Sequence, residues 1–497
     1  MDYFNVITSM VAFVENRLTD DIDHTELEKY LGYSIAHIRE IFRVNTKISL
    51  SRYILYRKIC NAAFEIAHDK KRTILEIAAE YGFESYDTFT RAFKRYMLMT
   101  PKDFRKKRIA IGRIRLGAGV YGPGVIKNVN SLYNPPDFWG EFNMMKDIKK
   151  SEESCILYGV PRVKYCYEEC TPFPSALKAC LNYMGQDISY SYLMAVSGGA
   201  FRLRWNTREW DGGNVDIMCI YEKATQVFKK SFKAAGRAYD ILERTEKVTK
   251  EDFISFIKAE IDEGRPVIAL GIIGPPEACI VTGYRNNGHT LLGWNFFQEY
   301  NEVAKDIEID KSGYFISENW WENPCTIGLM SIGEEQGEQT PIKEIVENAI
   351  DILTKEQIGV YAGGQAAYDH WANSLLDETQ FPRNAVMPML FERIMCQCDA
   401  TCMIGEGRYY GAAFLEWLGD NNEAIKEKCY KAAKYFKQEF TVARKMGELI
   451  EENQPRETQA RNLGEPSVRK ELAKCIMEAK KLDYSGCEVL REIVEMI

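Results

Sequence analysis

Residues 74–106 read ILEIAAEYGFESYDTFTRAFKRYMLMTPKDFRK, and this stretch decides the fold of the N-terminal part of the chain. It predicts a short helix, a turn at Gly82 and a second helix that begins after Ser85. Glycine adopts turn conformations that other side chains resist, and serine is a favoured helix N-cap. Phe89 and Phe93 fall on one apolar face of the second helix. The stretch therefore predicts a helix-turn-helix unit with one buried and one polar face.

The same plan occurs once before along the chain. Residues 22–42 contain a short helix, a turn at Gly32 and a second helix after Ser34, and residues 51–69 predict one long helix that joins the two units. A generic helical bundle with solvated charges is the alternative for either unit alone. The duplicated plan with two glycine turns makes that alternative the weaker one. We therefore expect an all-α domain with two helix-turn-helix units over residues 1–108.

Charge is distributed unevenly along the 497 residues. Residues 1–108 contain 19 Lys and Arg against 15 Asp and Glu, a net charge of +4, whereas the remainder contains 45 against 57, a net charge of −12. A basic N-terminal part followed by an acidic remainder is typical of a DNA-binding module joined to a part that does not bind DNA.

The stretch 74–106 resembles the second half of the AraC/XylS signature almost position by position. The shared positions are Ile77-Ala78, Gly82-Phe83, Phe93-Lys94 and Thr100-Pro101. The resemblance extends over about residues 5–107, and the N-terminal place of the DNA-binding part points to the MarA/Rob branch. It implies a transcriptional regulator whose two second helices enter successive major-groove segments on one face of double-stranded DNA, about 34 Å apart.

Carried onto this chain, the resemblance implies ten DNA-contacting residues. The base-reading positions would be Ala36, Arg39 and Glu40 in the first unit and Tyr86, Asp87, Thr90 and Arg91 in the second. The phosphate contacts would come from Arg43, Lys94 and Arg95. One departure is Glu28, which stands where the first unit usually has a small residue against the glycine turn. We therefore expect the first unit to be reshaped or to read DNA weakly.

The rest of the chain divides into three segments. Glycine and proline interrupt residues 109–150, which predicts an irregular linker. Residues 151–335 mix helix and strand patterns, including the buried strand at 266–274 and a hairpin that turns at Arg285-Asn286-Asn287-Gly288. Residues 336–497 are nearly all helical. The expected fold class is multidomain: an all-α double helix-turn-helix domain, an α+β domain and a helical C-terminal domain.

The α+β segment resembles the papain-like fold of bacteriocin-processing cysteine peptidases and their BtrH-type relatives in butirosin biosynthesis. The resemblance covers about residues 155–330. Three features carry it: PSALKACLNYMG at 174–185, Gly198-Gly199, and the strand that ends in Thr282-Gly283-Tyr284. In that family a cysteine caps the first helix and a histidine opens this strand, so that a thiolate–imidazole pair supplies the nucleophile.

In this chain Pro172 falls at the cysteine position and Glu277 at the histidine position. The resemblance therefore implies an inactive peptidase fold that is kept for binding, and we expect no enzymatic activity. The alternative is a cysteine-dependent peptidase or amine acyltransferase fused to a DNA-binding head. In that case Cys170 and His289 would have to supply the chemistry.

Aromatic and acidic residues in the C-terminal part predict an effector site. The candidate ligand-binding residues are Glu277, Trp205, Trp210, Tyr284, Trp294 and Trp320. An aromatic pocket with a carboxylate suits a cationic or amphipathic small molecule, or a peptide. The competing interpretation is that these tryptophans belong to the core. A third interpretation is that the C-terminal part contacts another protein, for which RNA polymerase is a candidate.

No cofactor and no metal site are predicted. Cys396, Cys398 and Cys402 lie in CQCDATC without the second ligand pair that zinc sites usually show, so we expect them to pack within a helix. No apolar run approaches the roughly 18 residues that a membrane span needs. The start of the sequence lacks the basic and apolar regions of a signal peptide. We therefore expect a cytoplasmic protein with reduced thiols.

Overall fold

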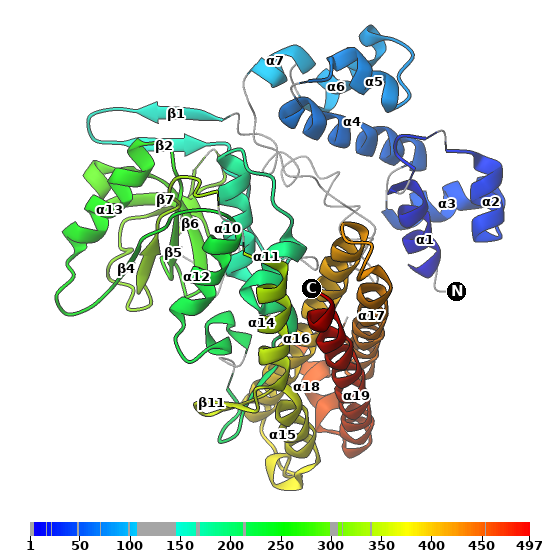
Figure 1. Ribbon diagram of the computed structural model, residues 1–497, viewed down its shortest axis with the longest axis vertical. Helices are drawn as coiled ribbons and strands as arrows, with labels where there is room; N and C mark the ends of the chain where they lie inside the picture. The colour runs from blue at the N-terminus through cyan, green and yellow to red at the C-terminus, as the bar shows by residue number, and fades with distance from the viewer. Residues whose placement is uncertain are drawn as a thin grey trace. The chain divides into compact units, whose positions relative to one another are not determined.

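The fold is described from a computed structural model (Figure 1). The described residues are 4–15, 17–20, 22–46, 49–69, 71–97, 100–106, 146–165, 169–211, 215–298, 307–310, 312–337, 340–452 and 454–497. Within these ranges, no helix combines the length and the apolar character that crossing a membrane requires.

The chain forms two compact units and passes between them repeatedly. The first unit comprises Met1–Glu168, Ser175–Asp187 and Asp240–Ile332, and the second comprises Glu169–Pro174, Ile188–Tyr239 and Gly333–Ile497. These units differ from the division at residues 108, 150 and 335 that the sequence predicts, since residues 188–239 cluster with the C-terminal helices. The predicted domain boundaries stay predictions.

The N-terminal part of the first unit is all helical, as the sequence predicts. Its helices are α1 (Phe4–Glu15), α2 (His24–Leu31), α3 (Ile35–Thr46), α4 (Leu50–His68), α5 (Ile74–Glu80), α6 (Tyr86–Met97) and α7 (Pro101–Lys106). Helix α4 is the predicted joining helix. Phe89 and Phe93 of α6, and Ile38 and Phe42 of α3, are fully buried in one shared core. The predicted apolar faces of both second helices are therefore confirmed.

The first unit also contains an antiparallel sheet. Its strands are β1 (Asp147–Lys150), β2 (Cys155–Tyr158), β4 (Ile241–Glu243), β5 (Val267–Leu270), β6 (Ala278–Arg285), β7 (Thr290–Trp294), β8 (Glu308–Ile309), β9 (Phe315–Ser317) and β10 (Gly328–Met330). Their order is β4-β10-β5-β6-β7-β9-β8, and β2 pairs with both β1 and β6. Helix α13 (Lys250–Asp262) packs against β2, β5 and β6 (Figure 1).

Three local predictions can be compared with this sheet. The strand predicted at 266–274 appears only over Val267–Leu270, as β5. Strands β6 and β7 form the predicted hairpin, with positive φ angles at Asn286, Asn287 and Gly288. Asparagine and glycine tolerate this backbone conformation best, which is why the turn could be located from the sequence. The predicted linker lies outside the described residues up to position 145, and its last four residues form strand β1.

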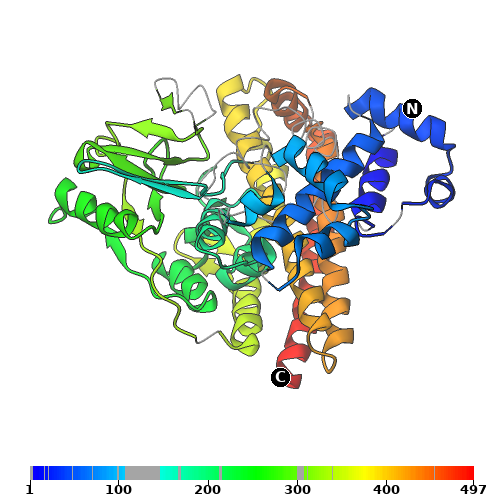
Figure 2. The ribbon, with the colours of Figure 1, turned by 90° about the horizontal axis from the view of Figure 1, so that it is seen from above.

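The second unit is mainly helical. Its elements are α11 (Tyr190–Ser197), η1 (Gly199–Phe201), β3 (Arg204–Asn206), η3 (Ile217–Ile220), α12 (Thr225–Ala234), α14 (Ile342–Thr354), β11 (Gln357–Ile358), β12 (Tyr361–Gly363), α15 (Gly364–Leu376), η5 (Glu378–Gln380), α16 (Met387–Asp420), α17 (Lys426–Leu449), α18 (Arg456–Gly464) and α19 (Pro466–Met496). Helices α16, α17 and α19 lie side by side, as Figure 2 also shows. The short sheet β11-β12-β3 interrupts the helical pattern that the sequence predicts for residues after 336.

Two glycines let α16 approach η1 closely. A Cβ at Gly407 would lie 2.8 Å from the carbonyl oxygen of Ala200, and a Cβ at Gly411 would lie 3.2 Å from the ring of Phe201. Larger side chains at either position would push the helix away from this segment. The spacing of four residues places both glycines on one face of α16, which fixes the side that faces η1.

A buried charge cluster holds the long helices together. Arg408 of α16 donates from Nε to Asp483 of α19 at 2.8 Å and from Nη1 to the carbonyl oxygens of Ala200 and Arg202 at 3.0 and 3.1 Å. Glu439 of α17 accepts a hydrogen bond from the Tyr368 hydroxyl at 2.5 Å. Burial raises the pKa of Glu439 well above its usual range. One guanidinium therefore faces two carboxyl groups, and burial favours the protonated form of Glu439.

Candidate functional site

The second helix-turn-helix unit is built by strong local signals. Thr73 and Glu76 form a reciprocal capping box at the start of α5. Gly82 then takes a positive φ of 77° in the turn, and the Ser85 hydroxyl accepts a hydrogen bond from the backbone N–H of Thr88 at 3.2 Å. Because capping satisfies N–H groups that have no partner inside the helix, these residues fix where α5 and α6 begin.

The outward face of α6 carries the predicted DNA-contacting residues of the second unit. Tyr86, Asp87, Arg91, Lys94 and Arg95 are all exposed. Among the described residues, no ion pair engages the three basic side chains. Their charges are therefore available to a nucleic acid without first breaking an internal pair.

Thr90 differs from its neighbours on α6. Its side chain is half-buried, and its hydroxyl oxygen is shielded from solvent without a hydrogen-bond partner in the part that the structure describes. A hydroxyl in this state is less accessible to a base edge than the sequence prediction assumes. A DNA contact by Thr90 would need its side chain to turn outward.

The first unit uses Glu28 to start its second helix. Gly32 has a φ of 70°, the turn that the sequence predicts. Oε1 of Glu28 accepts a hydrogen bond from the backbone N–H of Ile35, the first residue of α3, at 2.5 Å. A carboxylate is well placed there, since the N-terminus of a helix carries partial positive charge. Glu28, which stands where a small residue is usual, therefore has a structural function: it stabilises the start of α3.

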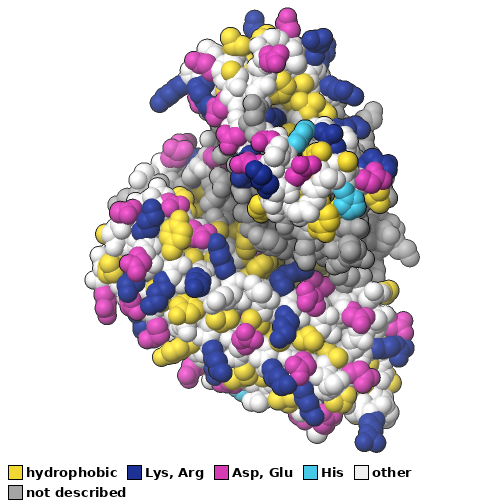
Figure 3. Space-filling model, turned by 90° about the vertical axis from the view of Figure 1, so that its right-hand side faces the viewer, with side chains coloured by type: hydrophobic (Ala, Val, Ile, Leu, Met, Phe, Trp, Pro, Cys, Tyr) yellow, Lys and Arg dark blue, Asp and Glu magenta, His cyan; other side chains and the backbone are white. Residues whose placement is uncertain are grey.

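The outward face of α3 is internally paired. Ala36, Arg39, Glu40 and Arg43 are exposed, as the sequence predicts. However, Arg43 binds Glu40 through two hydrogen bonds, Nε–Oε2 at 3.0 Å and Nη2–Oε1 at 2.7 Å. The hydrogen bond from Arg43 lowers the pKa of Glu40. On the face shown in Figure 3, basic and acidic side chains of the N-terminal helices are interspersed.

The two sequence-predicted replacements in the papain-like segment have clear positions. Pro172 is the first residue of α10 (Pro172–Tyr183), and Glu277 directly precedes β6. The carboxylate of Glu277 accepts a hydrogen bond from the hydroxyl of Tyr165, whose ring lies 5.0 Å from the ring of Phe296. A tyrosine therefore partners this carboxylate, where the sequence analysis expected a ligand cation.

Three candidate ligand-binding residues of the first unit occupy core positions. Trp294 and Trp320 are fully buried and donate their indole N–H groups to the carbonyl oxygens of Val160 and His289, at 2.8 and 3.1 Å. Tyr284 is buried too, and its hydroxyl donates to Asp262 at 2.8 Å. Side chains that are buried and satisfied in this way contact a ligand only if the core opens. This is the arrangement that the competing core interpretation predicts.

The other two candidates, Trp205 and Trp210, belong to the second unit. Their rings meet edge to face at 5.2 Å, and Trp205 also stacks on Trp371 at 5.9 Å. Trp205 is buried, whereas Trp210 is half-buried beneath the guanidinium of Arg393, which lies 4.8 Å from its ring centre. The six predicted residues are thus divided between two units, and Trp210 is the most accessible of the five aromatic ones.

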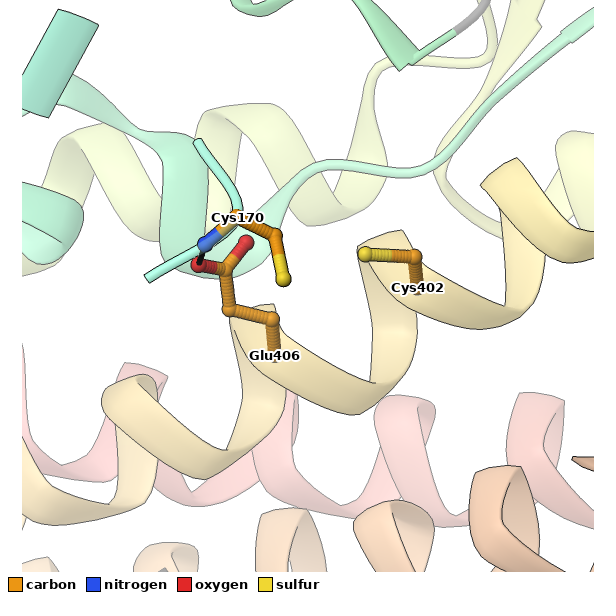
Figure 4. A group of neighbouring side chains, drawn as sticks. All are labelled: Cys170, Cys402 and Glu406. Atoms are coloured by element: carbon orange, nitrogen blue, oxygen red, sulfur yellow. Dashed lines mark hydrogen bonds between the residues drawn. The ribbon is translucent and has the colours of Figure 1, made fainter. Parts of the chain in front are cut away.

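The second unit brings together a group that the sequence analysis missed. One side-chain ligand atom from each of Cys170, Cys402 and Glu406 lies within 4.8 Å of the other two (Figure 4). The carboxylate of Glu406 accepts hydrogen bonds from the backbone N–H of Cys170 at 2.6 Å and from the hydroxyl of Tyr190 at 2.6 Å. The signal in the sequence was the four-residue spacing of Cys402 and Glu406, which places both on one helix face.

The three cysteines of CQCDATC do not converge on one point. Cys396 is buried, and Cys398 accepts a hydrogen bond from Arg456 at 3.0 Å. Cys402 instead faces Cys170, which comes from the segment before α10 (Figure 4). Burial raises the pKa of Cys396 to about 12 and that of Cys398 to about 11, so both remain thiols near neutral pH.

Comparison with known proteins identifies the N-terminal part. A family model described as a helix-turn-helix domain matches residues 27–107. The Transposon Tn10 TetD protein of Escherichia coli is 33% identical over 104 residues, which are 21% of this chain and 75% of that protein. The regulatory protein SoxS of Escherichia coli K12 is 30% identical over 107 residues, 22% of this chain and 99% of SoxS. The probable transcription factor PqrA of Proteus vulgaris is 34% identical over 104 residues, 20% of this chain and 84% of PqrA.

Proposed function

The chain belongs to the AraC/XylS family of DNA-binding transcriptional regulators, and from this premise we propose that α6 supplies most of its base discrimination. Helices α3 and α6 would enter successive major-groove segments, as two-unit readers of this kind do. The observation that carries the proposal is the contrast between their outward faces. Arg91 of α6 is exposed without an ion pair in the described part, whereas Glu40, a base-reading position of α3, is held by Arg43.

Electrostatics explains why this contrast matters for DNA. An arginine that is already hydrogen bonded to a carboxylate must exchange that partner for a phosphate or a guanine. The carboxylate of Glu40 also repels the negatively charged DNA backbone. Arg91 meets neither penalty, so its bidentate contact with guanine O6 and N7 would contribute more net discrimination.

Selection of binding sequences from randomised duplexes tests whether α6 contributes more base discrimination than α3. The full-length protein and its Arg91→Ala and Arg39→Ala variants are each used to enrich binding sequences, which are then sequenced. We expect Arg91→Ala to relax the preference at one or two base pairs strongly, and Arg39→Ala to relax it less. Equal relaxation by both variants, or a stronger effect of Arg39→Ala, would show that the first unit contributes at least as much.

We further propose that the C-terminal part is a non-enzymatic sensor with a degenerate papain-like fold. Pro172 at the start of α10 and Glu277 before β6 support the first half of this proposal, because neither side chain can act as a thiol nucleophile or an imidazole base. The effector class follows from Glu277 and its tyrosine partner. A carboxylate hydrogen bonded to Tyr165, whose ring packs against Phe296, suits a cationic or amphipathic molecule, or a peptide.

A thermal-shift screen tests the sensor proposal. Amphipathic amines and short cationic peptides are added to the full-length protein, and those that raise the melting temperature are titrated against wild type and Glu277→Gln. We expect the substitution to weaken binding at least tenfold, while the exposed control Glu322→Gln leaves it unchanged. The proposal fails if no compound of these classes binds, or if Glu277→Gln binds as tightly as wild type.

A further inference from the structure

We propose that Cys170, Cys402 and Glu406 bind a thiophilic divalent cation of the zinc and cadmium class. Their ligand atoms all lie within 4.8 Å of one another. In a tetrahedral zinc site with metal–sulfur bonds of about 2.3 Å, neighbouring ligand atoms are about 3.5–3.8 Å apart. The cluster therefore needs to contract by at most about 1.3 Å, which side-chain rotation can supply.

The backbone holds the three ligands in place before a metal arrives. Cys402 and Glu406 are one helical turn apart on α16, so they project from the same face. Cys170 precedes Glu406 by 236 residues in the chain. Its backbone N–H donates a hydrogen bond to Oε1 of Glu406 at 2.6 Å. Figure 4 shows the Cys402 sulfur pointing toward the Cys170 sulfur, with both to one side of this hydrogen bond.

The surroundings of Glu406 resemble the supporting shell of a metal ligand. The hydroxyl of Tyr190 donates to Oε1 at 2.6 Å, and the hydroxyl of Thr171 donates to Oε2 at 2.7 Å. Thr171 accepts in turn from Nη2 of Arg202 at 3.0 Å. Ligating carboxylates are commonly fixed by such outer hydrogen bonds. Oε2 accepts one hydrogen bond in the described part and retains a lone pair for a cation.

Binding of the cation would change the protonation of the cluster. The thiolate, and not the thiol, is the form of cysteine that ligates such a metal. Coordination converts both thiols to thiolates and releases two protons to solvent, so the metal replaces two S–H bonds by two metal–sulfur bonds. Binding should therefore strengthen as the pH rises.

The sequence interpretation missed the site because it sought a second cysteine pair near CQCDATC. The second thiolate comes instead from the segment before α10, and the third ligand is a carboxylate. This inference is independent of the proposed effector site at Glu277, which lies in the other unit.

Metal titration of the reduced, metal-free full-length protein tests the proposal. Cadmium is added while the ultraviolet charge-transfer absorption of cadmium–thiolate bonds is followed, and zinc affinity is measured by competition with a chromophoric chelator. We expect one equivalent to bind with two released protons. Cys170→Ser and Cys402→Ser should each lose the charge-transfer band and weaken zinc binding at least tenfold.

Cys398→Ser is the matched control. Cys398 lies one turn before Cys402 on α16, but its sulfur accepts a hydrogen bond from Arg456. It should retain wild-type binding. Serine is nearly isosteric with cysteine, and circular dichroism confirms that each variant is folded. The proposal is overturned if wild type binds no cadmium, if Cys170→Ser and Cys402→Ser bind as wild type does, or if Cys398→Ser alone loses the band.

Discussion

The carboxylate of Glu28 accepts a hydrogen bond from the backbone N–H of Ile35. A side chain of α2 therefore satisfies the first backbone N–H of α3, the helix that follows the turn at Gly32. The first N–H groups of a helix have no partner within it, and a side chain that satisfies one of them stabilises the helix start. Glu28 therefore couples the placement of α3 to α2.

Glu28→Ala should loosen the start of α3. Loss of a helix-start acceptor costs about 0.5–2 kcal/mol. Hydrogen exchange of the full-length protein should show faster exchange at Ile35 and along the first turn of α3, with no change in α6. Glu26→Ala removes the same charge from the same helix at an exposed position and should have no such effect. Unchanged exchange at Ile35 in Glu28→Ala would refute the role assigned to this carboxylate.

Glu40→Ala should release Arg43 for DNA. We expect tighter binding to arbitrary duplexes and a steeper dependence of the logarithm of affinity on the logarithm of salt, by about one unit for one added phosphate contact. Fluorescence anisotropy at several salt concentrations measures both quantities. Glu84→Ala removes an exposed acid without releasing an arginine and should leave the slope unchanged. An identical slope in Glu40→Ala would show that Arg43 makes no new phosphate contact.

The buried carboxyl of Glu439 predicts how stability depends on pH. Its folded-state pKa is raised above the unfolded value, mainly by burial, so the folded protein binds more protons than the unfolded one. The contribution of Glu439 to the free energy of unfolding is fully present below the pKa that this group has in the unfolded chain. It decreases as the pH rises toward the pKa in the folded protein, by at most about 1.4 kcal/mol per pH unit.

Glu439→Gln should remove this dependence, because an amide does not titrate and can still accept from Tyr368. Calorimetry at about pH 5 and about pH 8 compares the variant with wild type. Wild type should lose more stability than the variant between these pH values, while the exposed control Glu423→Gln should follow wild type. A parallel loss in wild type and Glu439→Gln would indicate that Glu439 is ionised in the folded protein.

Cys170 should react slowly with alkylating agents. Alkylation requires a thiolate, and Pro172 and Glu277 occupy the positions at which the papain-like resemblance places the activating cysteine–histidine pair. Iodoacetamide labelling near pH 6, followed by peptide mass spectrometry, should proceed no faster at Cys170 than with free glutathione. Fast labelling that is lost when a histidine is replaced would favour the alternative that the chain is a cysteine-dependent enzyme.

Local signals explain which features could be predicted from the sequence. The glycine turns, the capping box at Thr73 and the hairpin turn at Asn286-Asn287 each depend on residues within a few positions of one another. The ion pair between Glu40 and Arg43 also joins residues that are close in the sequence. Their three-residue spacing on a helix would have indicated it.

The remaining contacts join residues that are far apart in the chain. Tyr165 and Glu277 are 112 residues apart, and Cys170 and Glu406 are 236 residues apart. No periodicity or motif relates such positions before the chain folds. Trp294 and Trp320 illustrate the same limit, because a tryptophan in a binding pocket and one in a core have the same local sequence signature.

Affinity measurements on Arg91→Ala and Lys94→Ala test the central claim most directly. The full-length protein is titrated into its selected duplex and into a scrambled duplex at several salt concentrations. Arg91→Ala should cost about 1–3 kcal/mol on the selected duplex and little on the scrambled one. Lys94→Ala should weaken both equally and reduce the salt slope by about one unit. If Arg91→Ala weakens both duplexes equally, or neither, α6 does not read base sequence through this arginine and the account is contradicted.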